Sequence, residues 1–272
     1  PPTLSLHRST LLHTTRFLFP RVWRARRSAN KVRDIAYRMM DNYRQKYGSK
    51  MIPDSQRDFE QDTIISRICN NPNYADDDER AADIAILMAA GHDTTAYSIS
   101  WTLLEIFRNH VPELETYRKK IAGLPRDEWR NVPELDYMIK EGMRLNPVLA
   151  MGTVRDVGTE ITYQQFDEKI VLPKDSIYFI NLFPMFRNPL YYDEPDKFLP
   201  SRWANPKTEM AHVPFSIGPR NCVGRALADA ELHTVISTLL GRYDFEVESE
   251  GHAEFLTTLK PADCLLIPKK LF

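Results

Sequence analysis

The ten residues Phe215–Gly224, which read FSIGPRNCVG, constrain this chain more than any other part of its sequence. Two glycines and a proline around one cysteine require a tight, irregular backbone, because glycine accepts φ angles that other residues avoid. The apolar run from Ala226 onward then predicts a helix. Backbone amides of the loop and of the first helical turn favour the anionic form of a nearby thiol. The pattern therefore predicts a single thiolate held beneath a metal macrocycle.

The ordinary alternative for a lone cysteine is a small buried apolar residue. The full spacing F-x-x-G-x-R-x-C-x-G is much more specific than the cysteine alone. In this interpretation Phe215 covers the sulfur of Cys222, Arg220 meets an acidic group of the ligand, and Gly218 and Gly224 permit the close turn.

Charge excludes one class of function. The chain has 36 Lys and Arg against 37 Asp and Glu, so a net charge of −1 offers no global field for nucleic acid. Residues 8–50 are locally basic, and this segment could be a solvated face, a membrane-surface patch or a partner-docking patch.

The three cysteines, Cys69, Cys222 and Cys264, form no C-x-x-C pair. Their number and wide separation favour a reduced, cytosol-facing chain over a disulfide scaffold. No run of about 18 apolar residues predicts a membrane span. Because the first residue is Pro1, we expect a processed or truncated chain.

The longest predicted helix covers residues 79–109 and would extend roughly 45 Å at about 1.5 Å per residue. Its sequence is apolar nearly all round, which predicts a central, buried helix. Inside it lies the run Ala90-Gly91-His92-Asp93-Thr94-Thr95, whose residues are poor choices for a buried helix interior. A local rule broken at one place indicates a functional site, although a helix kink with Thr hydroxyls bonded to carbonyls is the alternative.

The other predicted elements make the fold mainly α with small β-sheets (α+β). In chain order they are a loop over 1–28, a helix over 29–47, a helix over 132–146, short strands at 160–163, 169–172 and 176–180, a proline-rich coil over 183–216, a helix over 225–243 and short strands at 245–247 and 264–267.

Two charged motifs precede the cysteine loop. Glu141 and Arg144 are three residues apart on one predicted helix and are therefore neighbours on its surface. Alone they could be an exposed ion pair of little value. The later motif P-x-x-F-x-P-x-R-W, residues 195–203, could supply Arg202 as a third partner for Glu141.

The order of these motifs, E-x-x-R, then P-x-x-F-x-P-x-R-W, then the cysteine loop, resembles the cytochrome P-450 family. The resemblance runs from about residue 29 to the end and corresponds to the second half of a typical member. It implies a P-450 fold, haem b as cofactor and Cys222 as the axial ligand of its iron. It also implies that Glu141, Arg144 and Arg202 form a structural network that pins the coil before Cys222.

The resemblance assigns further roles around the haem. Asp93 and Thr94 would be the acid–alcohol pair that delivers protons at an oxygen site beside Gly91. Arg220 and Arg155 would pair with the haem propionates. His92 shapes the pocket rather than ligating, and His212 lies close enough in sequence to approach the macrocycle. Candidate substrate contacts are Met88, Ala89, Ala90, residues 148–153 and residues 255–258.

As a whole, the resemblance implies one catalytic domain, of which residues 1–272 form the C-terminal portion. We expect a monooxygenase that inserts one atom of O2 into a small apolar organic substrate, with electrons from NADPH through NADPH–cytochrome P-450 reductase. The expected location is the cytosolic face of the endoplasmic reticulum membrane, reached through an N-terminal anchor that is missing here. The alternatives are a haem-thiolate isomerase or dehydratase acting on peroxides, and a truncated fragment without catalysis.

Overall fold

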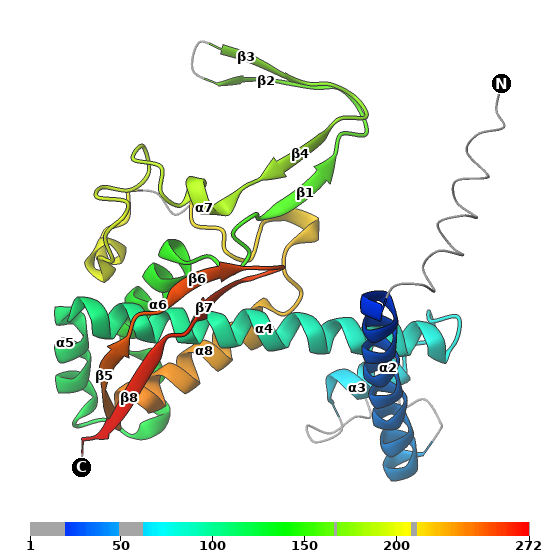
Figure 1. Ribbon diagram of the computed structural model, residues 1–272, viewed down its shortest axis with the longest axis horizontal. Helices are drawn as coiled ribbons and strands as arrows, with labels where there is room; N and C mark the ends of the chain where they lie inside the picture. Colours follow the sequence, from blue (N-terminus) through cyan, green and yellow to red (C-terminus); the bar gives the residue numbers. More distant parts are fainter. Residues whose placement is uncertain (1–19, 49–61, 166–167, 208–210, 272) are drawn as a thin grey trace. The chain divides into compact units, whose positions relative to one another are not determined.

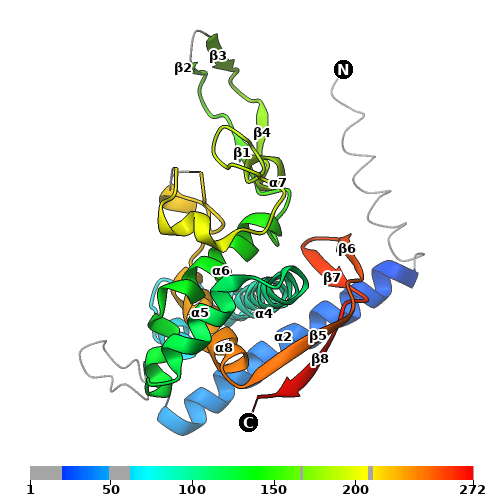
Figure 2. The ribbon, with the colours of Figure 1, turned by 90° about the vertical axis from the view of Figure 1, so that its left-hand side faces the viewer.

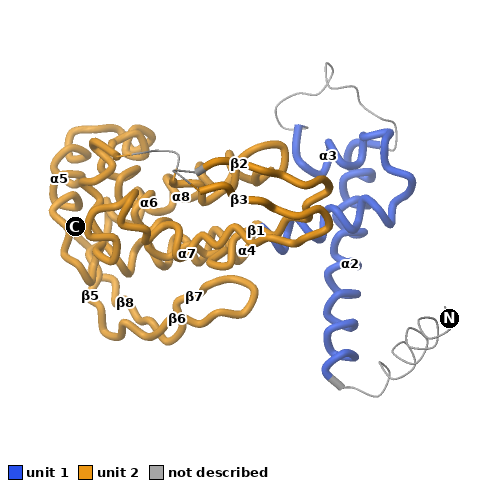
Figure 3. The backbone as a smooth tube through the Cα atoms, turned by 90° about the horizontal axis from the view of Figure 1, so that it is seen from above, with its two compact units in different colours: residues 1–90 blue, residues 91–272 orange. Residues whose placement is uncertain are grey.

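A computed structural model describes residues 20–48, 62–165, 168–207 and 211–271 (Figure 1). The chain divides into two compact units, residues 1–90 and residues 91–272, which Figure 3 shows in different colours. The long helix α4 (Asp77–Asn109) begins in the first unit and ends in the second. Each unit has its own apolar cluster, so each is described separately below.

The first unit contains α2 (Pro20–Tyr47), α3 (Ile64–Cys69) and the start of α4. Ala36 and Met40 of α2 pack with Ile68 of α3 and with Ala81 and Ile84 of α4. Two arginines of α2 add ion pairs to the first turn of α4. Arg44 lies 2.7 Å from Asp77, and Arg33 lies 2.6 Å from Asp78.

The expected loop over residues 1–28 is wrong for its last part, because α2 starts at Pro20 rather than at Ala29. Proline suits the first helical position, where its missing N–H leaves no hydrogen bond unmade. The arginines that follow are good helix formers. Gly48 has a φ of +85° and its N–H donates to the carbonyl of Arg44 at 2.8 Å, so the helix ends where expected.

The long helix α4 is buried over residues 101–107 but exposed from Met88 to His92. The prediction that it is buried throughout is therefore wrong for its middle. The cluster of the first unit reaches α4 through Ala81 and Ile84, while in the second unit apolar contacts resume only at Tyr97. Among the described residues, neither cluster uses the helix between Met88 and Asp93.

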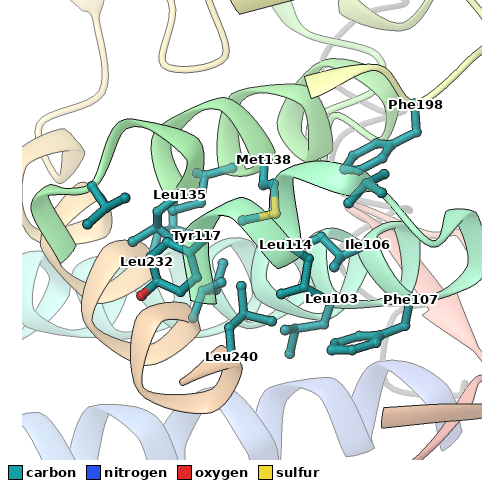
Figure 4. Packing of buried hydrophobic residues seen from close by; sticks show 14 of the residues in the cluster. Leu103, Ile106, Phe107, Leu114, Tyr117, Leu135, Met138, Phe198, Leu232 and Leu240 are labelled. Carbon is teal, nitrogen blue, oxygen red and sulfur yellow. The ribbon is translucent and has the colours of Figure 1, made fainter. Parts of the chain in front are cut away.

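The main core of the second unit is helical (Figure 4). It packs the last part of α4 against α5 (Pro112–Ile121), the 3-10 helix η3 (Arg126–Asn131), α6 (Pro133–Leu145) and α8 (Arg225–Leu240). Leu135, Ile106, Ile236 and Leu240 are at most 1 % exposed there. The predicted helices over 79–109, 132–146 and 225–243 thus correspond to α4, α6 and α8, with ends shifted by up to three residues.

The strands of the described residues form four antiparallel pairs. They are β1 (Thr153–Asp156) with β4 (Ile177–Ile180), β2 (Ile161–Gln165) with β3 (Glu168–Leu172), β5 (Tyr243–Ser249) with β8 (Leu265–Lys270), and β6 (His252–Phe255) with β7 (Leu259–Ala262). The first two pairs follow one another in an arm that projects from the helices of this unit (Figure 1 and Figure 2). The small-sheet expectation is confirmed, but β1, β6, β7 and the helix α5 were not predicted.

The proline-rich coil over 183–216 is confirmed as mostly irregular. Two short helices interrupt it, α7 (Leu182–Met185) and the 3-10 helix η4 (Pro200–Ala204). Although irregular, it contains buried residues such as Phe186, Phe198 and Trp203. Buried contacts of this kind give a long coil a fixed path.

Gly142 of α6 marks the closest approach to α4, and replacing it with alanine tests this packing. A Cβ there would lie 2.3 Å from Thr102 Oγ1 and 3.0 Å from Thr102 Cα. We expect Gly142→Ala to destabilise the chain by about 1–3 kcal/mol in urea denaturation, as overpacked cores do. Gly158→Ala is the control, since a Cβ there meets nothing within 4 Å. Equal stability of both variants would contradict the close helix crossing.

Candidate haem site

Cys222 lies between the 3-10 helix η5 (Gly218–Arg220) and α8, at the position expected from the sequence. Its backbone N–H donates to the carbonyl of Phe215 at 2.8 Å, which closes the loop. Ser216 and Gly218 have φ angles of +61° and +79°. These two left-handed backbone conformations produce the tight turn. Glycine adopts such a conformation without strain, so Gly218 suits its position. The loop thus holds the cysteine in a defined place at the start of α8.

The residues of the loop fit a large, flat apolar ligand. Cys222 is an exposed free thiol. Val223, the residue after Cys222, is 87 % exposed, and Ile217, earlier in the loop, is 65 % exposed. Leu227 on the first turn of α8 is 51 % exposed. Exposed apolar groups around a thiol carry a hydration cost that a bound macrocycle would remove. One thiolate donor with an open side is the ligand set of a haem-thiolate site.

The proposed proton-delivery residues are adjacent on the middle of α4. Asp93 and Thr94 are half-buried, whereas Gly91 is exposed and a Cβ there would meet no atom within 4 Å. His92 is 81 % exposed in its side chain, and its Nδ1 lies 2.7 Å from Asp93 Oδ1. The structure therefore places His92 against the carboxylate of Asp93. The helix α4 runs unbroken through residues 90–95.

The two arginines assigned to propionates lie on separate elements. Arg220 is exposed at the end of η5, within the cysteine loop. Arg155 is half-buried on β1, and its Nη1 donates to the carbonyl of Val154 at 2.8 Å. His212 lies elsewhere, between the rings of Trp203 at 4.6 Å and Phe186 at 5.5 Å. It therefore packs within the coil that precedes the cysteine loop.

Two of the three candidate substrate segments meet. Leu259 N–H donates to the carbonyl of Val148 at 2.8 Å, so residues 148–153 lie beside the turn over residues 255–258. Trp101 of α4 joins them, because its Nε1 donates to the carbonyl of Leu259 at 3.0 Å. The third segment, Met88 to Ala90, is exposed on α4.

The carboxylate of Glu141 is fully buried and accepts five hydrogen bonds. Arg144 donates two of them, both at 2.9 Å, and Arg202 Nε donates another at 2.9 Å. Trp203 Nε1 and the N–H of Leu199 donate at 2.9 and 2.8 Å. The structure thus brings together the three charged residues that the resemblance grouped. Such a carboxylate is stable when buried because its lone pairs are satisfied.

Arg144 extends this network into the coil. Its guanidinium is fully buried and donates to the carbonyls of Phe186, Pro195 and Lys197 at 2.8, 2.7 and 3.0 Å. Three carbonyls that no strand or helix would pair are therefore satisfied by one side chain. This fixes the path of the coil that leads to the cysteine loop.

Sequence reasoning missed part of the network. Trp203 directly follows Arg202 in the P-x-x-F-x-P-x-R-W motif, and that adjacency was the available signal. A second buried acid, Glu105 of α4, was missed entirely. It pairs with Arg108 at 2.7 Å and accepts a hydrogen bond from Asn146 at 2.5 Å. That contact depends on how α4 packs on α6, which the sequence alone does not show.

Two histidines beneath the loop have pKa values shifted in opposite directions. Burial, with nearby Lys140 and Arg144, lowers the pKa of His212 to about 3. The neighbouring carboxylate of Asp136 raises the pKa of His233, whose Nε2 lies 3.6 Å from Asp136 Oδ1, and burial offsets this effect only in part. His212 is therefore neutral at physiological pH, whereas the charged form of His233 is favoured by its acidic neighbour.

Comparison with known proteins identifies the family. The model of the cytochrome P450 family matches residues 5–272, so this chain belongs to the cytochrome P450 family. It is 32 % identical to human cytochrome P450 4F8 over 202 residues, which are 68 % of this chain and 37 % of that protein. It is 33 % identical to a pig taurochenodeoxycholic 6 alpha-hydroxylase over 197 residues, which are 69 % of this chain and 38 % of that enzyme.

Solved structures show the same fold. The chain matches the crystal structure of a cytochrome P450, CYP102L1, with a TM-score of 0.71 and 19 % identity, covering 92 % of this chain and 58 % of that one. The expected P-450 fold is therefore confirmed. The chain spans less than half the length of the curated relatives described above. No helix of the described residues is long and apolar enough to cross a membrane.

Neutralising the carboxylate of Glu141 tests the central network. We expect Glu141→Gln to lower the free energy of unfolding by about 3–5 kcal/mol, because Arg144 stays buried without its counter-ion. Urea denaturation of the chain measures the change. Glu194→Gln is the matched control, since its ion pair with Lys197 is exposed and should contribute less than about 1 kcal/mol. A Glu141→Gln loss as small as that of the control would contradict a buried hub.

The shifted pKa values of these two histidines predict that the free energy of unfolding depends on pH. Its slopes should be opposite on either side of about pH 6.5, the ordinary pKa of histidine. Between about pH 3 and 6.5, His212 is protonated in the unfolded chain but neutral in the folded chain. The contribution of His212 to stability is therefore lost as pH falls through this range. His233 has a raised pKa, so its contribution is complete below pH 6.5 and is lost as pH rises through the folded value.

Variants separate the two effects. The free energy of unfolding, measured from pH 4 to 9, should fall less steeply on the acid side in His212→Phe, which keeps an aromatic ring against Trp203. The remaining acid-side decline comes from carboxylates with lowered pKa values, such as Asp77 and Asp136. The free energy of unfolding should lose its alkaline-side decline in His233→Gln. An unchanged profile in either variant would show that the corresponding histidine does not titrate as its surroundings indicate.

Proposed function

We propose that this protein is a haem-thiolate monooxygenase that inserts one oxygen atom from O2 into an apolar organic substrate with electrons from NADPH. The observation that carries the proposal is the exposed Cys222 thiol, held by the Phe215 carbonyl among exposed apolar residues. Membership of the cytochrome P450 family supports it.

When bound, haem b would supply the iron centre at which oxygen is activated, with Cys222 as the axial thiolate. The chain holds this group from several elements. Arg220 of η5 and Arg155 of β1 are the proposed partners of the propionates. Phe215 orients the cysteine through its carbonyl, and Gly224 leaves its neighbourhood open, since a Cβ there would come no closer than 3.9 Å to the sulfur.

We assign proton transfer to residues in the middle of α4. The hydroxyl of Thr94 and the carboxylate of Asp93 are consecutive, half-buried and next to the open space at Gly91. A hydroxyl can pass a proton inward while a carboxylate replaces it from solvent. The contact of His92 with Asp93 places a second ionisable group on the solvent side of this relay. Proton delivery at this site is therefore the role we assign to Asp93 and Thr94.

The buried network is assigned a positioning role. Glu141, Arg144 and Arg202 fix the coil from Phe186 to Trp203, which runs on to the cysteine loop. They do not reach the reacting atoms. If Cys222 is to ligate haem, its position must be held precisely, and a buried support of this kind would do so.

Substrate and partners follow from the family and remain part of the proposal. Residues 148–153 and 255–258 are mainly apolar or small, which suits an apolar organic substrate. NADPH–cytochrome P-450 reductase is the proposed electron donor, and the cytosolic face of the endoplasmic reticulum membrane is the proposed location. The human and pig relatives at 32 % and 33 % identity support a eukaryotic type of family member.

The difference spectrum of the reduced carbon monoxide complex tests the proposal. We expect the chain reconstituted with haem to give the strongly red-shifted Soret band of a thiolate ligand. Cys222→Ala should lose that band, and Cys264→Ala, which also removes a non-disulfide thiol, should keep it. A band typical of imidazole ligation, or one that survives Cys222→Ala, would contradict the assignment. Absence of haem uptake would favour a fragment without catalysis.

A further inference from the structure

A pocket of about 340 Å³ opens beneath the cysteine loop, within the second unit. Three elements enclose it, namely α6, the coil over residues 212–217, and the first half of α8. Its size is in the range of pockets that take small molecules. Neither Cys222 nor any residue of α4 lines it, but Phe215, Ser216 and Ile217 of the cysteine loop do.

The inner wall of this pocket is apolar. Ile139 and Met143 of α6 are 1 % and 8 % exposed, and Val213 and Phe215 of the coil face the same space. His212 also lines it and packs against the rings of Phe186 and Trp203. Ile217, which also lines the pocket, is 65 % exposed, and a flat or compact apolar group would cover that surface at a gain in free energy.

The rim is charged, and its charged side chains differ in how closely they are paired. Lys140 lies 2.8 Å from Asp136, which also faces His233. Arg225 is 62 % exposed and reaches its acidic neighbour Asp229 only at 3.6 Å, too far for a hydrogen bond. Its guanidinium carbon also lies 5.7 Å from the ring centroid of Phe215.

Arg225 is therefore the rim cation best able to take a new partner. A guanidinium has five N–H donors and pairs with a planar carboxylate through two parallel hydrogen bonds. The same rim carries His233, Lys140 and two aspartates. Because Lys140 already pairs with Asp136 at 2.8 Å, an anionic head group would meet Arg225 rather than Lys140.

We propose that this pocket binds a small aromatic carboxylate, with its ring against Ile139, Met143 and Phe215 and its carboxylate on Arg225. The ligand would touch Phe215, the residue whose carbonyl holds the N–H of Cys222. The proposed site thus shares residues of the cysteine loop with the proposed haem site, although Cys222 itself does not line it.

Calorimetric titration of this chain without haem tests the proposal, so its outcome does not depend on the proposed oxygenase activity. The probes are 2-naphthoate and its neutral isostere 2-naphthamide. We expect 2-naphthoate to bind with a Kd of about 1 mM or tighter, as its size allows. The amide should bind at least tenfold more weakly, because it lacks the charge that Arg225 would pair.

Variants locate the binding. Arg225→Gln should weaken 2-naphthoate at least tenfold and leave the amide unchanged, whereas Arg126→Gln, an exposed arginine of η3, should change neither. Val213→Phe, which fills the pocket, should abolish both. The methyl resonance of Met143 should move during titration of the unsubstituted chain. Absence of saturable binding, equal affinity of acid and amide, or the same loss in Arg126→Gln would overturn the proposal.

Discussion

The buried carboxylate of Glu141 is the interaction on which the rest of the second unit depends. A charge without any solvent contact is tolerated only because five donors surround it. Those donors come from α6 itself and from a coil some sixty residues later in the chain. The cost of leaving any of them unpaired makes one path of the coil much more stable than others. An irregular segment therefore has the definition that regular structure usually provides.

This constraint explains how the chain can present a reactive residue on a loop. The coil passes Arg144 and Arg202, packs His212 between two aromatic rings, and enters the turn that Phe215 closes on Cys222. The helix α8 begins directly afterwards and packs into the main core. The thiol is thus held from both sides, while the apolar residues around it face outward. Exposed apolar surface beside a fixed thiol is the physical basis for assigning haem to this place.

Much of this arrangement could be predicted from the sequence, for identifiable reasons. The helices α4 and α8 contain long apolar runs, α6 lies between two prolines, and the motif around Cys222 contains turn residues at fixed positions. The contact between Arg202 and Glu141 was expected only because motif order resembled a known family. The start of α2 was missed because a proline was read as part of a loop. The exposure of α4 near Gly91 was missed because apolar composition cannot show which neighbours a helix has. The contacts of Glu105 and of His212 depend on packing between distant segments, which periodicity does not contain.

The most direct test of the central claim is the vibrational signature of the bond between iron and sulfur. The chain would carry Cys69→Ala and Cys264→Ala, so that Cys222 is its only thiol, and would be produced with cysteine containing sulfur-34 and loaded with ferric haem. The account predicts an iron–sulfur stretching band in the resonance Raman spectrum that moves to lower frequency with the heavier isotope. A haem complex whose spectrum has no isotope-sensitive band would contradict ligation by Cys222.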